Sequence, residues 1–379
     1  MSSHLGFADL AARLRGSIRS CAAETPGAGA SFPKRDDADF NQLARELFAL
    51  QFAHNRPYRN FCVARSVLPA SIDHWWQIPA IPAVAFKEVE LSCLPPAQRR
   101  RVFHSSGTTA DHPSRHYHNR TSLAVYEASI LPWFQAHVLA GSQDRWPIVC
   151  LTPPAFAVPH SSLAHMFQAV CNRFGLPDSA FTGTVTAEGG WELDLDASLN
   201  VIRAAVQRNR PLIVLGTAFS LVHLLDSLAT QELQFELPPG SRVMETGGYK
   251  DRSRTMSKGQ LHSLISNRLG VSAAHIISEY GMSELSSQAY DHRAGTTGQA
   301  SGTRAFHFPP WVRVQVVSPE TGLSVGAGET GLLRVFDLAN VYSVMAIQTE
   351  DLATAGDDGF ELQGRPPRSE PRGCSLMAT

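Results

Sequence analysis

Apolar residues recur at helical spacing in two stretches near the start of the chain. They are Phe7, Leu10, Leu14 and Ile18 in residues 7–20, and Phe40, Leu43, Leu47 and Leu50 in residues 37–52. Side chains three or four positions apart lie on one face of an α-helix, so both stretches are predicted to be amphipathic helices. Residues 23–33 between them are rich in Ala, Gly and Pro, a composition typical of a flexible connection.

From residue 101 onwards, short apolar runs alternate with longer stretches of helical spacing. The runs are RVF, PIVCLTPP, PLIVLG, RVMETGG and HIISEYG, which begin at residues 101, 147, 211, 242 and 275. This alternation predicts helices layered on a sheet, which is the α/β fold class. Residues 311–363 differ, because their strand-like runs are separated by Gly-rich turns, and they predict a β-rich lobe.

These patterns divide the chain into four predicted parts. Residues 1–35 form an N-terminal helix and a flexible linker, and residues 36–310 form an α/β core. Residues 311–363 form a β-rich lobe of the same core, and residues 364–379 are a short tail that carries Cys374. A chain of 379 residues is long enough to bury a core of this size.

Composition argues against several classes of protein. The formal net charge is −1, from 33 basic and 34 acidic residues, so no overall field attracts nucleic acid or anionic lipid. No apolar run approaches the ~18 residues that indicate a membrane-spanning helix. The six cysteines include no CxxC pair and are too sparse for a disulfide scaffold. We therefore expect a cytoplasmic protein with no nucleic-acid partner, no membrane span and no zinc site.

A Ser/Thr-rich loop follows the first of the short apolar runs. Ser105, Ser106, Gly107, Thr108 and Thr109 combine short hydroxyl side chains with a Gly that allows tight curvature. Backbone N–H groups in such a loop can cradle phosphate oxygens. No GK[ST] follows, so this is not a Walker A motif. A solvated Ser/Thr turn is the alternative interpretation.

Three further segments carry groups suited to a nucleotide. Tyr280 and Gly281 follow an apolar run, and Glu284 beside them is a carboxylate of the kind that binds Mg²⁺. Asp351 offers two oxygens to ribose hydroxyls, and Arg365 offers donors to ribose or phosphate. Taken singly, each is equally well explained as a surface residue near a turn.

In this order, the motifs resemble those of the adenylate-forming superfamily, which includes acyl- and aryl-CoA ligases. The resemblance implies a phosphate loop at 105–109, Mg²⁺ binding by Glu284, adenine contact by Gly247 and Gly248, and nucleotide binding by Tyr280, Gly281, Asp351 and Arg365. Ala110 and Glu350 depart from the pattern, because the superfamily usually has Gly there. The resemblance implies the superfamily's α/β N-terminal domain with a β-rich lobe and a truncated C-terminal domain, and ATP and Mg²⁺ as cofactors.

A closer resemblance is to the acyl-protein synthetases of bacterial luminescence, the LuxE type. It rests on Ser114-Arg115-His116 after the loop and on the segments 159–163, 246–250 and 372–376. In that family the acyl group passes from the adenylate to a cysteine near the C-terminus and then to an acyl reductase. The matching residue here is Cys374. Without the resemblance, Cys374 would be interpreted as an inert tail residue.

The short length of the tail after Arg365 favours a protein cysteine over free CoA as the predicted acyl acceptor. Only 14 residues follow Arg365. A full CoA ligase would carry about another 100 residues there, which is the size of a small domain. That domain brings a lysine that assists adenylation, and Lys250 is a candidate substitute with a solvated surface lysine as the alternative.

The sequence therefore predicts an enzyme that activates a carboxylic acid, of the fatty-acid kind, as acyl-AMP. Thr108, Lys250 and Glu284 are expected to support that step, and Cys374 to accept the acyl group for delivery to a reductase partner. An acyl- or aryl-CoA ligase that uses free CoA is one alternative, and a non-catalytic nucleotide-binding scaffold of a reductase complex is another. Aromatic candidates for the acid pocket, which are also common in ordinary cores, are Trp75, Trp76, Phe86, Phe156, Phe167 and Phe219.

Overall fold

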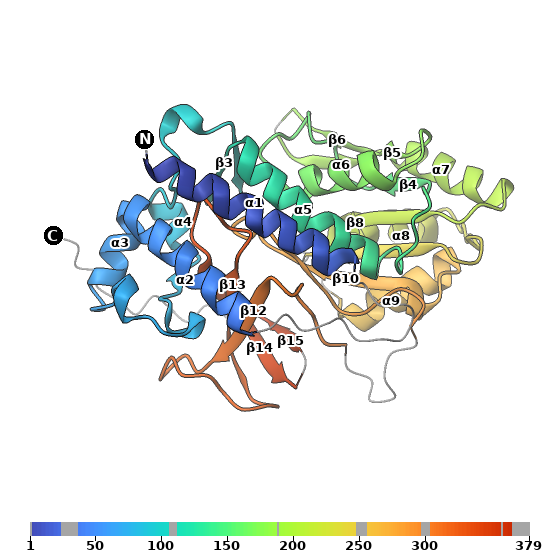
Figure 1. Cartoon of the computed structure of the whole chain (residues 1–379). Coiled ribbons are helices and arrows are strands. Elements are labelled where there is room, and N and C mark those ends of the chain that lie inside the picture. Colours follow the sequence, from blue (N-terminus) through green and yellow to red (C-terminus); the bar gives the residue numbers. More distant parts are fainter. Residues whose placement is uncertain are drawn as a thin grey trace.

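In the computed structural model of the protein, the described residues are 2–23, 37–105, 112–187, 189–247, 256–296, 304–357 and 359–365. A six-stranded sheet with the order β11-β10-β9-β8-β4-β5 lies at the centre (Figure 1). Its strands are β4 (Ile148–Cys150), β5 (Ala180–Phe181), β8 (Ile213–Thr217), β9 (Arg242–Thr246), β10 (Ile276–Tyr280) and β11 (Ala289–Tyr290). All neighbours pair in parallel except β10 and β11. The carboxyl ends of the parallel strands therefore share one edge, where open α/β sheets bind ligands.

Helices cover both faces of this sheet. One face carries α5 (Arg120–His137) and α6 (Ser162–Phe174), and the other carries α7 (Leu195–Gln207), α8 (Ala218–Thr230) and α9 (Lys258–Leu269). Along β4, Ile148 belongs to the first core and its neighbour Val149 to the second, and both are fully buried. Burial on both faces explains why these strands are nearly continuous apolar runs. The predicted α/β layering is confirmed.

Local signals in the sequence set the ends of these helices. At the start of α5 the side chain of Asn119 accepts a hydrogen bond from Ser122 N at 2.8 Å, and at the start of α8 Thr217 accepts one from Ser220 N at 3.0 Å. Such caps satisfy backbone donors that the helix itself leaves unpaired. α9 ends at Gly270, whose φ of 69° is a conformation that favours glycine.

Two antiparallel hairpins lie beside the sheet. β6 (Gly183–Val185) pairs with β7 (Trp191–Leu193), and β2 (Arg101–His104) pairs with β3 (Arg115–His118). The predicted phosphate loop connects β2 to β3. A backbone hydrogen bond of 2.9 Å from His104 N to His160 O ties the end of β2 to the segment that follows β4. The base of the loop is thereby fixed near the carboxyl edge of the six-stranded sheet.

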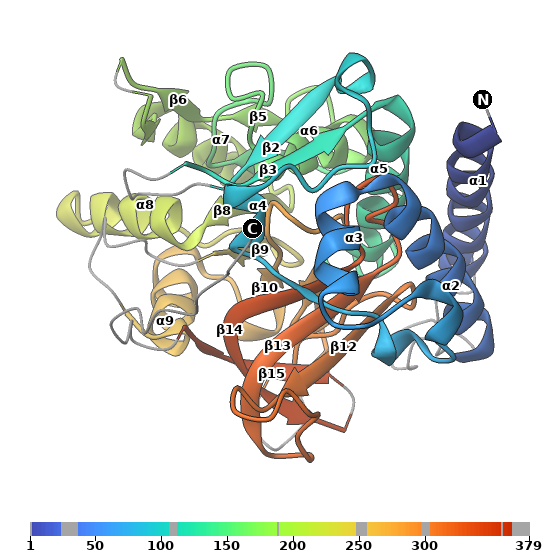
Figure 2. The same cartoon turned by 90° about the vertical axis from the view of Figure 1, so that its left-hand side faces the viewer.

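A second sheet forms the predicted β-rich lobe. It comprises β12 (Val312–Val317), β13 (Thr330–Asp337), β14 (Ala346–Gly356) and β15 (Gly359–Gly364), with the short β1 (Ile81–Pro82) parallel to β14. Figure 2 shows this lobe and the β2–β3 hairpin on opposite sides of β10. The strands expected within residues 311–363 are confirmed. The contribution of β1 was not predicted, because two residues give no periodic pattern.

The N-terminal helices pack on this lobe, and α1 also lies along α5 (Figure 1). α1 (Ser2–Ala23) and α2 (Asp37–His54) contain the two predicted amphipathic stretches, and α3 (Arg56–Val63) and α4 (Ala85–Glu88) follow. Phe7 of α1 stacks on Tyr342 at a centroid distance of 4.9 Å, and Phe40 of α2 lies in the same core as Phe336. The division into four parts stays a prediction. Short 3₁₀ helices cover Pro69–Ser71, Trp75–Gln77, Pro96–Gln98 and Ala273–His275.

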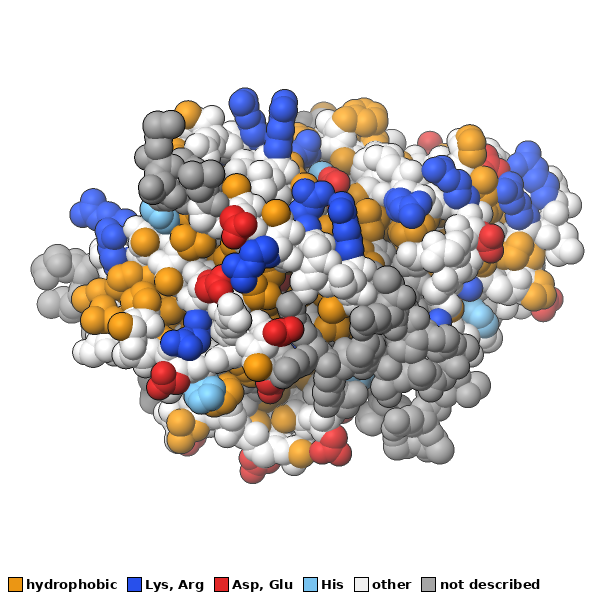
Figure 3. Space-filling model, viewed as in Figure 1, with side chains coloured by type: hydrophobic (Ala, Val, Ile, Leu, Met, Phe, Trp, Pro, Cys, Tyr) orange, Lys and Arg blue, Asp and Glu red, His pale blue; other side chains and the backbone are white. Residues whose placement is uncertain are grey.

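The helices and the surface charges are relevant to whether the protein binds a membrane or a nucleic acid. None of the helices in the described part of the chain combines the length and the apolar character that crossing a bilayer requires. On the face shown in Figure 3, basic, acidic and apolar side chains are interspersed.

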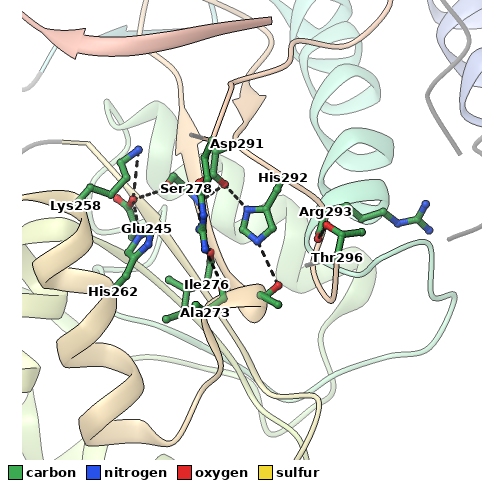
Figure 4. Close-up of polar contacts among 12 residues, drawn as sticks. Glu245, Lys258, His262, Ala273, Ile276, Ser278, Asp291, His292, Arg293 and Thr296 are labelled. Atoms are coloured by element: carbon green, nitrogen blue, oxygen red, sulfur yellow. Dashed lines mark hydrogen bonds and ion pairs between the residues drawn. The ribbon is translucent and has the colours of Figure 1, made fainter. Parts of the chain in front are cut away.

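A buried ionic cluster closes the sheet beside β11 (Figure 4). The Asp291 side chain is fully buried, accepts a 2.8 Å hydrogen bond from Ser278 N, and lies 2.8 Å from His292 Nδ1. Arg304 Nη1 lies 3.3 Å from its second oxygen. Burial alone would raise the pKa of Asp291, but His292, Arg304 and the Ser278 N–H together lower it to about 2.

Asp291→Asn is expected to lower the free energy of unfolding by about 3 kcal/mol at pH 7, because it leaves a partly buried Arg304 without its charged partner. A lowered pKa means that the carboxylate stabilises the fold above the ordinary Asp pKa of about 4, and that this stabilisation is lost as the pH falls towards 2. Urea unfolding followed by circular dichroism at pH 7 and pH 3 measures both effects, and the deficit should be smaller at pH 3. The exposed Asp196→Asn on α7 is the control, with an expected change within about 0.5 kcal/mol. Equal losses in the two variants would contradict the prediction.

Candidate active site

Tyr280, Asp351 and Arg365 meet at the carboxyl end of β10. The Tyr280 hydroxyl donates a 2.8 Å hydrogen bond to Asp351 Oδ2, and Arg365 Nε donates a 3.0 Å hydrogen bond to Asp351 Oδ1. Asp351 lies on β14 and Arg365 lies directly after β15, so the β-rich lobe supplies two of the three groups. Three residues singled out in separate segments of the sequence are therefore in direct contact.

The charges at this contact fix the direction of its hydrogen bonds. Burial and then the Asp351 carboxylate raise the pKa of Tyr280 well above its usual value, so its hydroxyl stays protonated and donates. Burial lowers the pKa of Arg365, but Asp351 and the nearby Glu350 raise it more. A carboxylate has about four acceptor positions. Asp351 therefore has room for further donors such as hydroxyl groups.

A hydroxyl relay, formed by Ser114 and Ser283, joins the base of the predicted phosphate loop to Glu284. Ser105 N donates to Ser114 Oγ at 3.2 Å, and Ser114 Oγ lies 3.2 Å from Ser283 Oγ. Ser283 Oγ donates to Glu284 Oε2 at 2.9 Å. Because Ser283 gives its single hydroxyl proton to Glu284, Ser114 is the donor between the two hydroxyls. Ser105 and the Glu284 carboxylate thus belong to one hydrogen-bonded unit.

His116 strengthens the same connection. The side chain is buried, and its Nδ1 lies 2.9 Å from the carbonyl oxygen of Ser283. Burial lowers the pKa of His116 to about 4, so the ring is neutral near pH 7. A carbonyl oxygen only accepts hydrogen bonds, so Nδ1 carries the proton. The hairpin segment therefore holds Ser283 through both its hydroxyl and its carbonyl group.

The β-rich lobe holds the other side of the loop that carries Glu284. Asn340 Nδ2 donates to the Glu284 carbonyl oxygen at 2.9 Å. Asp337 accepts hydrogen bonds from Ser286 N at 2.9 Å and from Ser287 Oγ at 2.8 Å. Burial raises the pKa of Asp337 to about 6, although these donors favour its charged form. The backbone on either side of the Glu284 side chain is thus held by side chains from the lobe.

Gln51 of α2 extends this network to the N-terminal helices. Its Nε2 donates to Asn340 O at 2.7 Å, and its Oε1 accepts from Met345 N at 3.0 Å. Gln51 and Asn340 are both buried. Sequence reasoning missed Gln51, Asp337 and Asn340, because single polar residues within apolar stretches show no pattern. The one available signal was that polar residues inside such stretches need a buried partner.

The Gly-rich segment follows β9, beside β10. Gly247 has a φ of 72°, a conformation that favours glycine. Figure 4 shows Glu245 between two basic side chains, with its Oε1 3.9 Å from Lys258 Nζ and 3.4 Å from His262 Nε2. Thr246 donates a hydrogen bond to Glu279 of β10. Polar contacts therefore hold the start of this segment against the strand that ends at Tyr280.

Several predicted residues lie outside the described residues, so their roles stay predictions. They are Ser106, Gly107, Thr108 and Thr109 of the phosphate loop, together with Gly248, Lys250 and Cys374.

The donor set at Glu284 can be compared with the needs of a metal ion. Within the described ranges, no group of three or more His, Cys, Asp or Glu side chains is placed to hold a metal. Mg²⁺ is usually bound by one or two carboxylates together with phosphate oxygens and water. The single buried Glu284 carboxylate therefore fits a Mg²⁺ that arrives with a nucleotide.

The aromatic candidates for an acid pocket do not gather in one place. Trp75 and Phe86 lie in the core beneath the N-terminal helices, whereas Phe167 lies in the core between the six-stranded sheet and α6. Phe156 is 84% exposed and Trp76 is 44% exposed. These candidates therefore lie in separate parts of the structure, and their role in an acid pocket stays a prediction.

Comparison with known proteins agrees with both resemblances drawn from the sequence. The family model described as "Acyl-protein synthetase, LuxE" matches residues 34–377. The chain is also similar to the long-chain-fatty-acid–luciferin-component ligase of Aliivibrio fischeri, with 20% identity over 318 residues that cover 82% of this chain and 78% of that protein.

Among solved structures, the fold is similar to that of 2-hydroxyisobutyryl-CoA ligase. Its open conformation, in complex with 2-HIB-AMP and CoA, aligns with a TM-score of 0.62 and 14% identity over 90% of this chain and 74% of that chain. Its thioesterification state aligns with a TM-score of 0.62 and 15% identity over 90% and 72% of the two chains. At these identities the likeness shows the fold alone, and it is the fold expected from the motifs. Since the family match extends over most of the sequence and the fold agrees with it, the chain belongs to the LuxE family of acyl-protein synthetases, which are AMP-forming ligases.

Proposed function

We propose that the protein joins a fatty acid to AMP in a Mg²⁺-dependent reaction with ATP, and then transfers the acyl group to the thiol of Cys374 for delivery to an acyl reductase. One observation carries this proposal. The Tyr280–Asp351–Arg365 contact and the relay from Ser105 to Glu284 reach the end of β10 from opposite sides. A nucleotide bound there would meet a ribose acceptor at one end and phosphate-binding groups at the other.

In the first half-reaction, a carboxylate oxygen of the acid attacks the α-phosphorus of ATP, and the bond to pyrophosphate breaks. Asp351 would accept hydrogen bonds from the ribose hydroxyls, while Arg365 and Tyr280 hold the Asp351 carboxylate in place. The backbone N–H groups of residues 105–109 would donate to the phosphate oxygens on which charge grows. Mg²⁺ bound by Glu284 would neutralise part of that charge.

In the second half-reaction, a thiolate attacks the carbonyl carbon of the acyl-adenylate, a thioester forms and AMP leaves. An ordinary thiol is only a few per cent ionised at pH 7. Arg372, two positions before Cys374, would favour the thiolate if the two side chains lie close together. The fatty-acid substrate is supported by the name of the Aliivibrio relative. A cytoplasmic location is supported by the unpaired thiols of Cys62 and Cys93.

Glu284→Ala is expected to reduce acid-dependent exchange of pyrophosphate into ATP on the order of 100-fold, because charge on the phosphates loses a stabilising group. A Mg²⁺ titration of the exchange rate should show a higher requirement in the variant. The exposed Glu320→Ala in a turn of the lobe is the control and should behave like the wild type. Near-normal exchange in Glu284→Ala would remove this glutamate from the reaction.

Asp351→Ala is expected to raise the KM for ATP about 10- to 100-fold with a smaller change in kcat, because hydrogen bonds from hydroxyls to a carboxylate are lost. Glu350→Ala is a matched control from the same strand, since its carboxylate is 61% exposed and lies 3.8 Å from Arg365. It should change the KM less than threefold by the usual weakness of exposed ion pairs, roughly 0–1 kcal/mol. A similar KM in both variants would argue against contact between Asp351 and the ribose.

Cys374→Ala is expected to leave pyrophosphate exchange intact and to abolish the covalent acyl adduct, because the second step loses its nucleophile. Intact mass spectrometry after incubation with ATP, Mg²⁺ and a panel of fatty acids measures the adduct and identifies the acid. Cys21→Ser is the control and should keep the adduct. An adduct that persists in Cys374→Ala places the acceptor elsewhere, and a thioester formed only on added CoA would indicate a CoA ligase.

A further inference from the structure

The face of β10 opposite Tyr280 carries a buried carboxyl group. Successive side chains of a strand point to opposite faces, so Glu279 points away from the side used by Tyr280 and Asp351. Glu279 is 7% exposed and accepts a hydrogen bond from Thr246. Gly281, the residue after Tyr280, is exposed, and a Cβ atom added there would lie 2.6 Å from Glu279 Oε1. Glycine at 281 therefore lets the exposed backbone lie directly over the Glu279 carboxyl.

Gln288 lies on the same side and has an unused acceptor. It is 3% exposed, and its Nε2 donates to Tyr290 Oη at 3.2 Å and to Met166 Sδ at 3.4 Å. Its Oε1 is buried and has no hydrogen-bond partner among the described residues. The Cβ atom of Gln288 would lie 3.7 Å from a Cβ atom at Gly281, beside the Glu279 contact. Exchanging the two amide atoms would leave Nε2 without a partner instead, so one polar atom stays unsatisfied in either orientation.

His118 of β3 adds a second buried polar atom without a partner among the described residues. His118 Nδ1 lies 3.2 Å from Ser122 Oγ, so the ring is hydrogen-bonded on that side. Its Nε2 atom is buried and has no partner among the described residues. The His118 ring lies 6.1 Å from that of Tyr126, whose pKa is raised by burial and then by Glu279.

The position of these groups suits the non-reacting part of the acid. The proposed nucleotide occupies the Tyr280 face of β10 and reaches the phosphate loop through its phosphates. An acid whose carboxylate attacks the α-phosphorus must extend away from both, and next to Gly281 it would meet the Glu279 and Gln288 side chains. Buried acceptors that lack a donor are rare in folded proteins and costly, and a ligand that brings a donor removes the cost.

We propose that Glu279, Gln288 and His118 line the binding site for the chain of the acid, and that the protein selects an acid that carries a hydroxyl group rather than an unsubstituted alkyl acid of the same length. This inference rests on the proposed function. Gln288 Oε1 accepts the proton of the hydroxyl, and His118 and the Glu279 carboxyl complete the polar wall. A site built to bind a hydroxyl group discriminates strongly against the analogue that lacks it, because its polar groups are then left unpaired.

The test compares matched acids in acid-dependent pyrophosphate exchange. The panel consists of straight-chain acids of six to fourteen carbons and their monohydroxy derivatives, with the hydroxyl at each position along the chain. At its best chain length and position, the wild type should use the hydroxy acid with a kcat/KM at least about 10-fold above that of the alkyl acid. Gln288→Leu should reduce that ratio at least about 10-fold while it keeps the KM for ATP, and Gln168→Leu on the surface of α6 is the control.

Each outcome has a defined meaning. A wild type that prefers the alkyl acid at every length and position overturns the inference, whatever the variants do, and leaves the proposed function intact. An unchanged ratio in a folded Gln288→Leu protein also overturns the assignment of this residue. Absence of exchange with every acid in the panel overturns the proposed function and this inference together.

Discussion

Strand β10 ends at Tyr280, and the segment beyond it is held by hydrogen bonds from outside the six-stranded sheet. Buried backbone and side-chain groups without hydrogen-bond partners cost free energy. The segment that follows the strand can therefore adopt only conformations in which these groups are hydrogen-bonded. Here the partners come from two directions. Ser114 and His116 of the hairpin side hold Ser283, and Asn340 of the lobe holds the Glu284 carbonyl. The need to satisfy these groups fixes Glu284 and, through it, the geometry of the candidate site.

The buried polar residues of the lobe are better explained by geometry than by stability. A fully buried carboxyl such as Asp337 is expensive to transfer from water, and burial raises its pKa to about 6 despite its donors. An apolar residue would fill the same space without that cost. The Asp337 carboxyl instead fixes the orientation of the segment after Glu284, because it accepts hydrogen bonds from Ser286 N and Ser287 Oγ at defined positions. The β-rich lobe thereby determines the conformation of the loop that carries Glu284, which follows β10 of the six-stranded sheet.

Much of this arrangement was predictable from the sequence, and the reasons are local. The amphipathic helices, the apolar parallel strands and the Gly-punctuated lobe each have a periodic pattern, so their existence followed from it. The contact of Tyr280, Asp351 and Arg365 followed from motif order and resemblance. Asp337, Asn340 and Gln288 could not be found in this way. Their roles depend on partners distant in sequence, and one polar residue in an apolar stretch does not reveal which partner it has. The aromatic candidates could not be narrowed down from the sequence either, because large apolar side chains are used throughout the core.

Gln51 of α2 connects the N-terminal helices to the candidate site. It bonds Asn340 and Met345 with both ends of its amide, and Asn340 bonds the loop of Glu284. A shortened protein that starts after α2 would lose the Gln51 amide. The backbone carbonyl of Asn340 and the backbone N–H of Met345 would then lack this partner in the interior. The loop that carries Glu284 thus depends on contacts from residues near both ends of the chain. A shortened protein that preserves the candidate site would therefore also have to keep residues 37–54.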